Sequence, residues 1–306
     1  MNSVSRRNFL KLLGVAGASV PALTLLGDVV HPRLRASAQS TLGTVVIVKQ
    51  GGLTIHSYVA PEASFLVTGQ VIETPNRLVV VDTQLLQTFG KDFRAYVDSI
   101  GKPVERHILS HAHPDHFLAA NLFADFPFHT TAGIAEAVEA YIAGGNVAGV
   151  AALIGESEVP QTPRLPEAKI SVGEEVIDGV KFVYSVVNNA EAPEHLNIGL
   201  PDAGILVVQD LVFSNAHYFP GADRENWVKS LEALRTQAGY NLLLVGHGLP
   251  ASLGALDEAI AYLQFAIEQT KTAKDANELI AALQARYPAY GAAGILNFWQ
   301  QFFPAQ

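Results

Sequence analysis

The stretch SHAHPDH, at residues 110–116, constrains the fold of this chain more than any other. It follows VERHILS, a short apolar run at 104–110 that predicts a buried strand, and it precedes a predicted helix. Three imidazoles and one carboxylate within six residues are costly to bury without partners, whereas on a loop they can converge on a cation. A solvated histidine-rich loop is the alternative, but the spacing matches a recurrent pattern of metal ligands. The sequence therefore predicts a metal site at the end of a strand, with Pro114 stiffening the turn.

Short β-branched runs, separated by Gly, Pro or Asn, predict strands on both sides of this loop. The predicted strands lie at 44–48, 53–60, 64–73, 77–82, 104–110, 169–172, 180–187, 196–200, 205–214 and 242–248. The predicted helices lie at 84–100, 117–126, 132–145, 224–237 and from Pro250 to the end. Three prolines predict a loop at 156–168. Two blocks of strands followed by helices predict one α+β domain of packed layers, with the sheets inside and the helices outside.

The beginning of the chain has the pattern of a secretory signal. Paired arginines in SRRNFLK, at 5–11, resemble the twin-arginine export motif, and ASA at 36–38 is a small-residue cleavage pattern. A transmembrane anchor is the alternative, but the apolar run at 12–27 is short for a span and is diluted by glycine and proline. We therefore expect a leader at 1–38 and a mature domain at 39–306 with a helical C-terminal segment. We also expect export to the periplasm or otherwise out of the cytoplasm by the twin-arginine machinery, and no stable membrane anchor after cleavage.

Removal of this leader would make the chain strongly acidic. The leader holds five basic residues and one acid, so its loss changes the formal charge from −9 to −13. That charge argues against nucleic acid and anionic membranes as partners, and we expect a small-molecule substrate instead. The chain has no cysteine, so neither a disulfide nor a thiolate ligand is available.

The motif SHAHPDH after a strand resembles the ligand motif of the metallo-β-lactamase superfamily. The resemblance covers essentially the whole mature chain and implies a four-layer αβ/βα sandwich in a single domain. It implies that Asp210 in LVVQDLVFS bridges two metals and that His247 in VGHG is the last histidine ligand. It also implies that Asp82 in VVVDT lies behind the ligands. The chain departs from the family at Phe117–Ala120, where Gly-Gly often stands, and this departure changes the packing below the site and not its ligands.

A site of this family needs one more ligand, usually a histidine, from the loop before the Asp210 strand pair. NAEAPEHLNIGLP offers His195 by residue type and Glu191 by position. Between that ligand and Asp210 the chain must form a turn, a strand, a hairpin and a second strand, which takes about 18 to 20 residues. Glu191 is 19 residues before Asp210 and His195 only 15, so the spacing favours Glu191 as the ligand, with His195 behind the ligands or facing the substrate. Glu191-Ala-Pro193 is also similar to an element of the longer alkylsulfatase branch; a solvated loop acid is the alternative for Glu191.

The resemblance then implies two divalent metal ions. Their predicted ligands are His111, His113 and Glu191 on one ion, Asp115, His116 and His247 on the other, and Asp210 on both. Two such cations, three carboxylates and a hydroxide sum to zero charge, against +1 with a histidine in place of Glu191, so bound water should be less acidified. Zinc is the default metal, and the additional carboxylate moves the preference somewhat toward manganese or iron.

The implied chemistry is hydrolysis by a metal-bridging hydroxide, with Asp115 as ligand and orienter of that hydroxide. The substrate class is an ester-type bond (a lactone, lactam, thioester or sulfate ester), and the Glu-Ala-Pro element favours sulfate esters. A periplasmic metal-binding or interaction protein without catalysis is the alternative. His217 and Tyr218, after the Asp210 strand, are candidate substrate contacts, with plain loop packing as the alternative. The other histidines of the mature chain are predicted to be structural: His56, His107 and His129.

Overall fold

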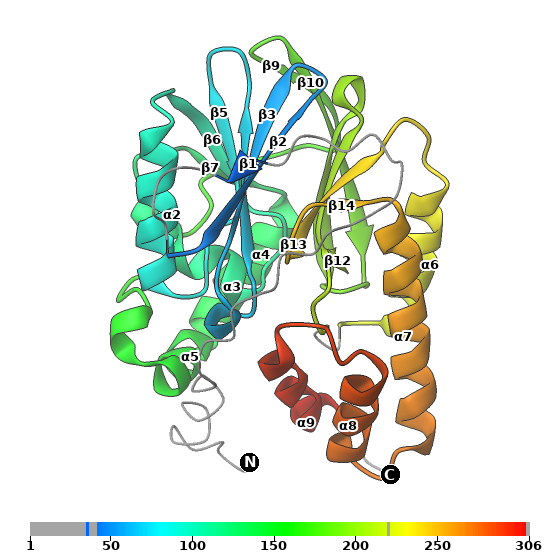
Figure 1. Cartoon of the computed structure of the whole chain (residues 1–306). Helices are drawn as coiled ribbons and strands as arrows, with labels where there is room; N and C mark the ends of the chain where they lie inside the picture. Colours follow the sequence, from blue (N-terminus) through cyan, green and yellow to red (C-terminus); the bar gives the residue numbers. More distant parts are fainter. Residues whose placement is uncertain (1–34, 37–41, 219–220, 304–306) are drawn as a thin grey trace.

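The computed structural model describes residues 35–36, 42–218 and 221–303. Two β-sheets face each other in the middle of the molecule, and helices cover their outer sides (Figure 1). The predicted mixed α+β fold, an αβ/βα sandwich, is confirmed by this arrangement.

The first sheet is built from the N-terminal half of the chain and has eight strands in sequence order. Its strands are β1 (Arg35–Ala36), β2 (Thr44–Gln50), β3 (Leu53–Val59), β4 (Thr68–Glu73), β5 (Leu78–Val81), β6 (Val104–Ile108), β7 (Phe128–Thr130) and β8 (Ala168–Lys169). Neighbours are antiparallel from β1 to β5 and parallel from β5 to β8. Parallel neighbours need long crossovers, which is why helices separate these later strands.

The second sheet has six strands in the order β14, β13, β12, β11, β10, β9. Its strands are β9 (Gly173–Ile177), β10 (Val180–Asn188), β11 (Glu194–Leu200), β12 (Ile205–Phe213), β13 (Leu242–His247) and β14 (Ala251–Ser252). The strands from β9 to β12 are antiparallel, and β12 and β13 are parallel. Two neighbouring strands of this sheet, β12 and β13, carry the predicted ligands Asp210 and His247.

Helices cover both outer faces (Figure 1). The helices of the described residues are α2 (Gln87–Ser99), α3 (Pro114–Phe117), α4 (Ala132–Ala143), α5 (Asn146–Ile154), α6 (Arg224–Arg235), α7 (Gly254–Thr272), α8 (Ala276–Arg286) and α9 (Trp299–Phe302), and of these α3 lies at the site between the sheets. Short 3-10 turns are η1 (Glu62–Ser64), η2 (Leu118–Phe123), η3 (Glu156–Glu158), η4 (Pro201–Ala203) and η5 (Ala293–Phe298). The run LVVV in β5 shows why the layers form. Val79 and Val81 belong to the core between the sheets, whereas Leu78 and Val80 pack with Phe93 of α2, because strand side chains alternate between faces.

Several predicted elements differ from the structure. The strand predicted at 169–172 keeps only Lys169, in β8, while β9 and α5 were not predicted. The strand predicted at 64–73 begins only at Thr68, because Phe65 and Leu66 have left-handed backbone (φ 56° and 59°) that cannot continue a strand. The helix predicted at 117–126 is mostly the 3-10 turn η2, in which the amide of Ala119 donates to the carbonyl of Gln84 rather than within a helix. The segment after Pro250 starts with the short strand β14 before its helices begin.

The predicted leader at 1–38 lies outside the described residues, except for Arg35–Ala36, which form β1 beside β2. Among the described residues, no single helix has the length and apolarity to cross a membrane. Taken together, α4 and α5 pass on length and composition, but they are bent by 67° at the break between them.

Candidate metal centre

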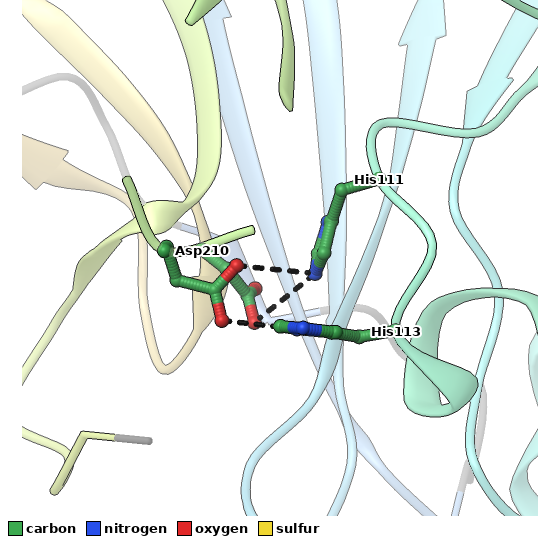
Figure 2. Close-up of side chains that lie close together, drawn as sticks. His111, His113 and Asp210 are labelled. Atoms are coloured by element: carbon green, nitrogen blue, oxygen red, sulfur yellow. Dashed lines mark ion pairs between the residues drawn. The ribbon is translucent and has the colours of Figure 1, made fainter. Parts of the chain in front are cut away.

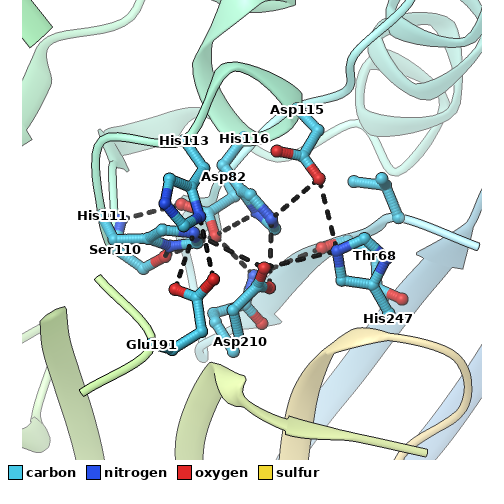
Figure 3. Close-up of polar contacts among 12 residues, drawn as sticks. Thr68, Asp82, Ser110, His111, His113, Asp115, His116, Glu191, Asp210 and His247 are labelled. Carbon is cyan, nitrogen blue, oxygen red and sulfur yellow. Dashed lines mark hydrogen bonds and ion pairs between the residues drawn. The ribbon is translucent and has the colours of Figure 1, made fainter. Parts of the chain in front are cut away.

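The predicted ligands come together between the two sheets, beside α3 (Figure 3). They form two sets in which the donor atoms lie within 4.8 Å of one another, and Asp210 belongs to both. Apart from Asp210, the first set is named here the Glu191 group: His111, His113 and Glu191. The second is the His247 group: Asp115, His116 and His247. The structure thus brings together all seven residues that the sequence predicts as ligands.

The loop after β6 supplies four of these side chains, and Pro114 explains its shape. A residue before proline is pushed to extended backbone, and His113 has φ −85° and ψ 142°. Pro114 itself opens the short helix α3, which carries Asp115 and His116. His113 therefore leaves the loop in a different direction from the two helical side chains, and the group surrounds a common space.

Asp210 faces both groups from the middle of β12. Its Oδ2 is 3.5 Å from Nε2 of His111, and its Oδ1 is 3.1 Å from Nε2 of His116. Figure 2 shows the rings of His111 and His113 turned toward this carboxylate. Gly246 of the neighbouring strand β13 lies against it, and a Cβ at that position would overlap Oδ1 of Asp210. Only glycine leaves room for the shared carboxylate at this point.

His247 ends β13 and is held on two sides. Its Nδ1 donates to the carbonyl of Phe65 at 2.7 Å, and its ring stacks on Phe213 at a centroid distance of 4.5 Å. The left-handed turn at Phe65 and Leu66 presents that carbonyl to the ring. These contacts leave Nε2 of His247 directed at Asp115 and Asp210, each 3.3 Å away.

Glu191, and not His195, faces the other ligands. Glu191 is 1% exposed, with Oε1 2.9 Å from Nδ1 of His113 and Oε2 3.7 Å from Nε2 of His111. His195 lies inside β11 and stacks on the ring of His111, with centroids 4.9 Å apart and planes at 20°. Neither ring nitrogen of His195 has a hydrogen-bond partner among the described residues. Burial holds the pKa of His195 well below its usual value, so this ring is a neutral packing partner of a predicted ligand.

The loop that carries Glu191, between β10 and β11, is fastened by the first turn of α6. Nδ2 of Asn226 donates to the carbonyls of Asn188 and Asn189, at 2.8 and 2.9 Å. The amide of Ala222 donates to the carbonyl of Glu191 itself at 3.1 Å. A loop with these main-chain bonds holds its buried carboxylate in place although it is not part of either sheet.

Several donor atoms of the cluster crowd together without pairing. The Nε2 atoms of His111, His116 and His247, Oδ1 of Asp210 and both carboxylate oxygens of Glu191 are buried, and none makes a hydrogen bond of normal geometry with the described residues. Buried polar atoms are nearly always paired in folded proteins, so six such atoms directed at one space require a ligand. Imidazole nitrogens and carboxylate oxygens are the donors of zinc, manganese and iron sites. The residues therefore fit divalent cations.

The carboxylates and imidazoles of the cluster lie so close together that each shifts the pKa of the others. Burial opposes a charge on His116, but the carboxylates of Asp210, Asp115 and Asp82 together outweigh it and hold the pKa of that ring well above its usual value. For His247, burial again lowers the pKa, but Asp210 and Asp115 together raise it to about 10. Burial would raise the pKa of Asp210, but His116 and His247 hold it well below its usual range. A cation that binds here must therefore displace protons from imidazoles.

Asp82 lies behind the ligands, as the sequence predicts, and orients two of them. It is fully buried, and its Oδ2 accepts from Nδ1 of His116 at 3.0 Å and from Oγ of Ser110 at 2.7 Å. Oγ of Ser110 in turn accepts from Nδ1 of His111 at 2.9 Å. Both rings are thereby turned with Nε2 toward Asp210, which is how outer carboxylates position histidine ligands.

Sequence reasoning missed two residues of this outer network. Ser110 is part of the motif, but its position alone did not reveal the link to Asp82. Gln209 donates from Nε2 to Oδ2 of Asp82 at 2.6 Å. The available signal was a polar residue beside Asp210 in ILVVQDLVF, a strand whose residues are all buried.

His217 and Tyr218, the candidate substrate contacts, lie in a buried aromatic cluster. They are 2% and 1% exposed. Nδ1 of His217 is 3.1 Å from the hydroxyl of Tyr262 in α7, and the ring of Tyr218 stacks on the same tyrosine at 4.3 Å. This position favours the packing alternative for both. The site instead reaches solvent at His113 and Asp115, whose side chains are 24% and 16% exposed.

The family model of the metallo-beta-lactamase superfamily matches residues 64–247, more than half of the chain, and this span contains all seven predicted ligands. The chain belongs to the metallo-β-lactamase superfamily. Among solved structures, a metallo-beta-lactamase from Pontibacter korlensis matches 76% of this chain and 99% of its own length, with a TM-score of 0.53 and 16% identity. At that identity the likeness shows the shared superfamily fold alone. No curated protein matches the sequence. Superfamily members are generally hydrolases, and the His/Asp/Glu cluster is compatible with a dinuclear metal hydrolase.

Proposed function

We propose that this protein is a dinuclear metal-dependent hydrolase that cleaves an ester-type bond of a small molecule after export from the cytoplasm. One observation carries the proposal: seven donor side chains from both sheets converge, and six of their buried donor atoms have no hydrogen bond among the described residues. Structural packing does not explain such an arrangement, because each unpaired buried polar atom has a cost of about 1–3 kcal/mol.

The Glu191 group would hold one cation and the His247 group the other, with Asp210 between them. Two divalent cations, when bound, supply an activated water and polarise the substrate oxygen. Zinc is the metal we propose by default. The three carboxylates also suit manganese or iron.

Among the chain's own residues, Asp115 is the one we propose to be catalytic. Its Oδ2 is directed at two rings, 3.6 Å from Nε2 of His116 and 3.3 Å from Nε2 of His247. Its other oxygen remains to accept a hydrogen bond from the attacking water and so to orient it. Because Asp115 is one of the two solvent-reaching side chains of the cluster, the substrate would approach beside it.

The substrate class we propose is a lactone, lactam, thioester or sulfate ester. Within this class, the Glu191-Ala-Pro193 element supports sulfate esters, because it is similar to the alkylsulfatase branch. The buried, loop-fastened position of Glu191 beside His113 supports a ligand role for it rather than a solvated one.

Metal analysis of purified protein tests the assignment. Glu191→Ala should lose about one metal per chain, whereas His195→Ala should keep both, since His195 contacts a ligand only by stacking. Retention of both metals in both variants, or a loss confined to His195→Ala, would contradict the role of Glu191. A panel of sulfate esters, lactones, lactams and thioesters tests the activity. Full metal occupancy without turnover of any of them would favour a metal-binding protein without catalysis.

A further inference from the structure

Gln209 connects the two sheets directly behind the metal cluster. It is fully buried in β12, and its Nε2 donates to Oδ2 of Asp82, at 2.6 Å, and to the carbonyl of Thr68, at 3.2 Å. Both acceptors belong to the N-terminal half of the chain, which forms the opposite sheet. The same Asp82 oxygen accepts from Nδ1 of His116. Gln209 and the predicted ligand His116 are therefore bound to one shared carboxylate oxygen.

The backbone of Gln209 is as unusual as its contacts. Its φ is 36°, a positive value in the middle of a strand, where L-residues with a long side chain are rare. The pairing of β12 with β13 shifts register on either side of it, from Val207 and again toward Phe213. Such an irregularity re-aims the side chains that follow, and the next residue is Asp210. Strained backbone of this kind persists only where the surroundings fix it.

A second glutamine supports the first from the opposite sheet. Gln70 of β4 donates from Nε2 to Oε1 of Gln209 at 3.3 Å and to the carbonyl of Val245 at 3.0 Å. Its Oε1 accepts from the hydroxyl of Ser57 at 2.6 Å. All of these groups are fully buried, so Gln70 keeps Oε1 of Gln209 paired, whereas Asp82 and Thr68 by themselves set the direction of Nε2.

We propose that Gln209 is a positioning residue for the metal centre. Its side chain fixes the Asp82 carboxylate, and through it the rings of His116 and His111, while its left-handed backbone turns Asp210 toward both groups. The inference rests on the metal binding of the proposed function and adds to it a residue that contacts no predicted metal ion.

Titration with Zn²⁺ against a competing chelator tests this role. Gln209→Met removes the donor to Asp82 at similar volume, and we expect metal affinity to fall about 10- to 100-fold, the range for outer partners of ligands. Gln209→Asn is the second variant. Asparagine tolerates left-handed backbone, so the fold is kept, but the side chain is one methylene too short for Asp82, and the same loss is expected. The absorption spectrum of the Co²⁺-loaded protein should change in both variants, because ligand geometry changes.

Gln70→Met is the matched control. It breaks the inter-sheet bond to Gln209 and lowers the stability of the metal-free protein, but it leaves the bond between Gln209 and Asp82. A positioning role predicts Zn²⁺ affinity within about threefold of wild type and an unchanged Co²⁺ spectrum for this control. Equal losses of affinity in Gln70→Met and Gln209→Met, or wild-type affinity in both Gln209 variants, would overturn the inference. If wild type itself bound no Zn²⁺, the proposed function would fail instead, so the two failures are distinguishable.

Discussion

The Glu191 group and the His247 group share Asp210 but are held in place in different ways. In the His247 group, both histidines have their second nitrogen bound by buried acceptors, Asp82 for His116 and the Phe65 carbonyl for His247. In the Glu191 group, one ligand comes from a loop that is fastened to α6, and His113 is the most exposed imidazole of the cluster. Both histidines of the His247 group therefore have a buried acceptor behind them, whereas the Glu191 group depends in part on the contacts of a loop. We expect the His247 group to bind its cation more tightly.

Gly246→Ala should have the largest effect, because it acts on the one ligand that both groups share. The new Cβ would overlap Oδ1 of Asp210 in a fully packed strand, so the carboxylate must leave its position. We expect loss of both metals and of activity, measured by metal analysis after purification. Gly149→Ala in α5 is the control, since a Cβ there meets nothing within 4 Å. Retention of two metals in Gly246→Ala would show that Asp210 is not the common ligand.

Acidification should weaken the His247 group strongly. The pKa of His247 is raised to about 10, so its ring is protonated at neutral pH and a cation must displace that proton. Metal affinity should therefore fall as the pH falls, by roughly tenfold per pH unit for each proton displaced. Proton release into an indicator solution during Zn²⁺ titration near neutral pH measures this directly. A titration that releases no protons would contradict the raised pKa.

Asn226→Ala should weaken metal binding at the Glu191 group and leave metal binding at the His247 group unchanged. It removes the two side-chain bonds from Asn226 to the Glu191 loop, each of which contributes about 0.5–1.5 kcal/mol, and leaves the main-chain bond from Ala222. We expect about a tenfold loss of affinity for one metal per chain, the one at the Glu191 group, with the other unchanged. Ser230→Ala, on the same helix, is the control, because its hydroxyl bonds only the carbonyl of Asn226. Equal weakening of both sites would show that the loop does not belong to one group alone.

His195→Phe should have the smallest effect. The ring of His195 stacks on His111 and its nitrogens bind no described residue, so phenylalanine can replace it. We expect Zn²⁺ affinity within about threefold of wild type, whereas His195→Ala leaves a cavity and lowers the free energy of unfolding by about 2 kcal/mol or more. Chelator competition and chemical denaturation measure the two quantities. A loss of one metal in His195→Phe would restore His195 as a ligand.

Local patterns predicted the layers and the set of side chains that come together at the site. The β-branched runs and the order of strands and helices predicted the sandwich, which the structure confirms. The motif around His111 and the spacing from Glu191 to Asp210 depend on short stretches of chain, and the side chains they name lie together in the fold. Spacing also separated Glu191 from His195, since a residue inside β11 points elsewhere than the loop before it.

The features that the sequence did not predict depend on contacts between residues far apart in the chain. The turn at Phe65 and Leu66 occupies an apolar run that resembles a strand, and its role depends on His247, about 180 residues later. His217 lies after the Asp210 strand, where a substrate contact is expected, but α7 covers it with Tyr262. Gln209 becomes meaningful only beside Asp82 of the opposite sheet. None of these partners is marked by periodicity or by local spacing.

The predicted ligands come from both halves of the chain, so bound cations would restrict the conformational entropy of the chain. His111 and His247 are 136 residues apart in the sequence, and the chain has no cysteine with which to link such distant segments. Cations held between them would close a long loop, as a disulfide does, and would stabilise the folded state without any change in the core. We expect this cross-link to be reversible: a chelator that removes the cations should lower the free energy of unfolding and leave the two sheets held together by their packing alone.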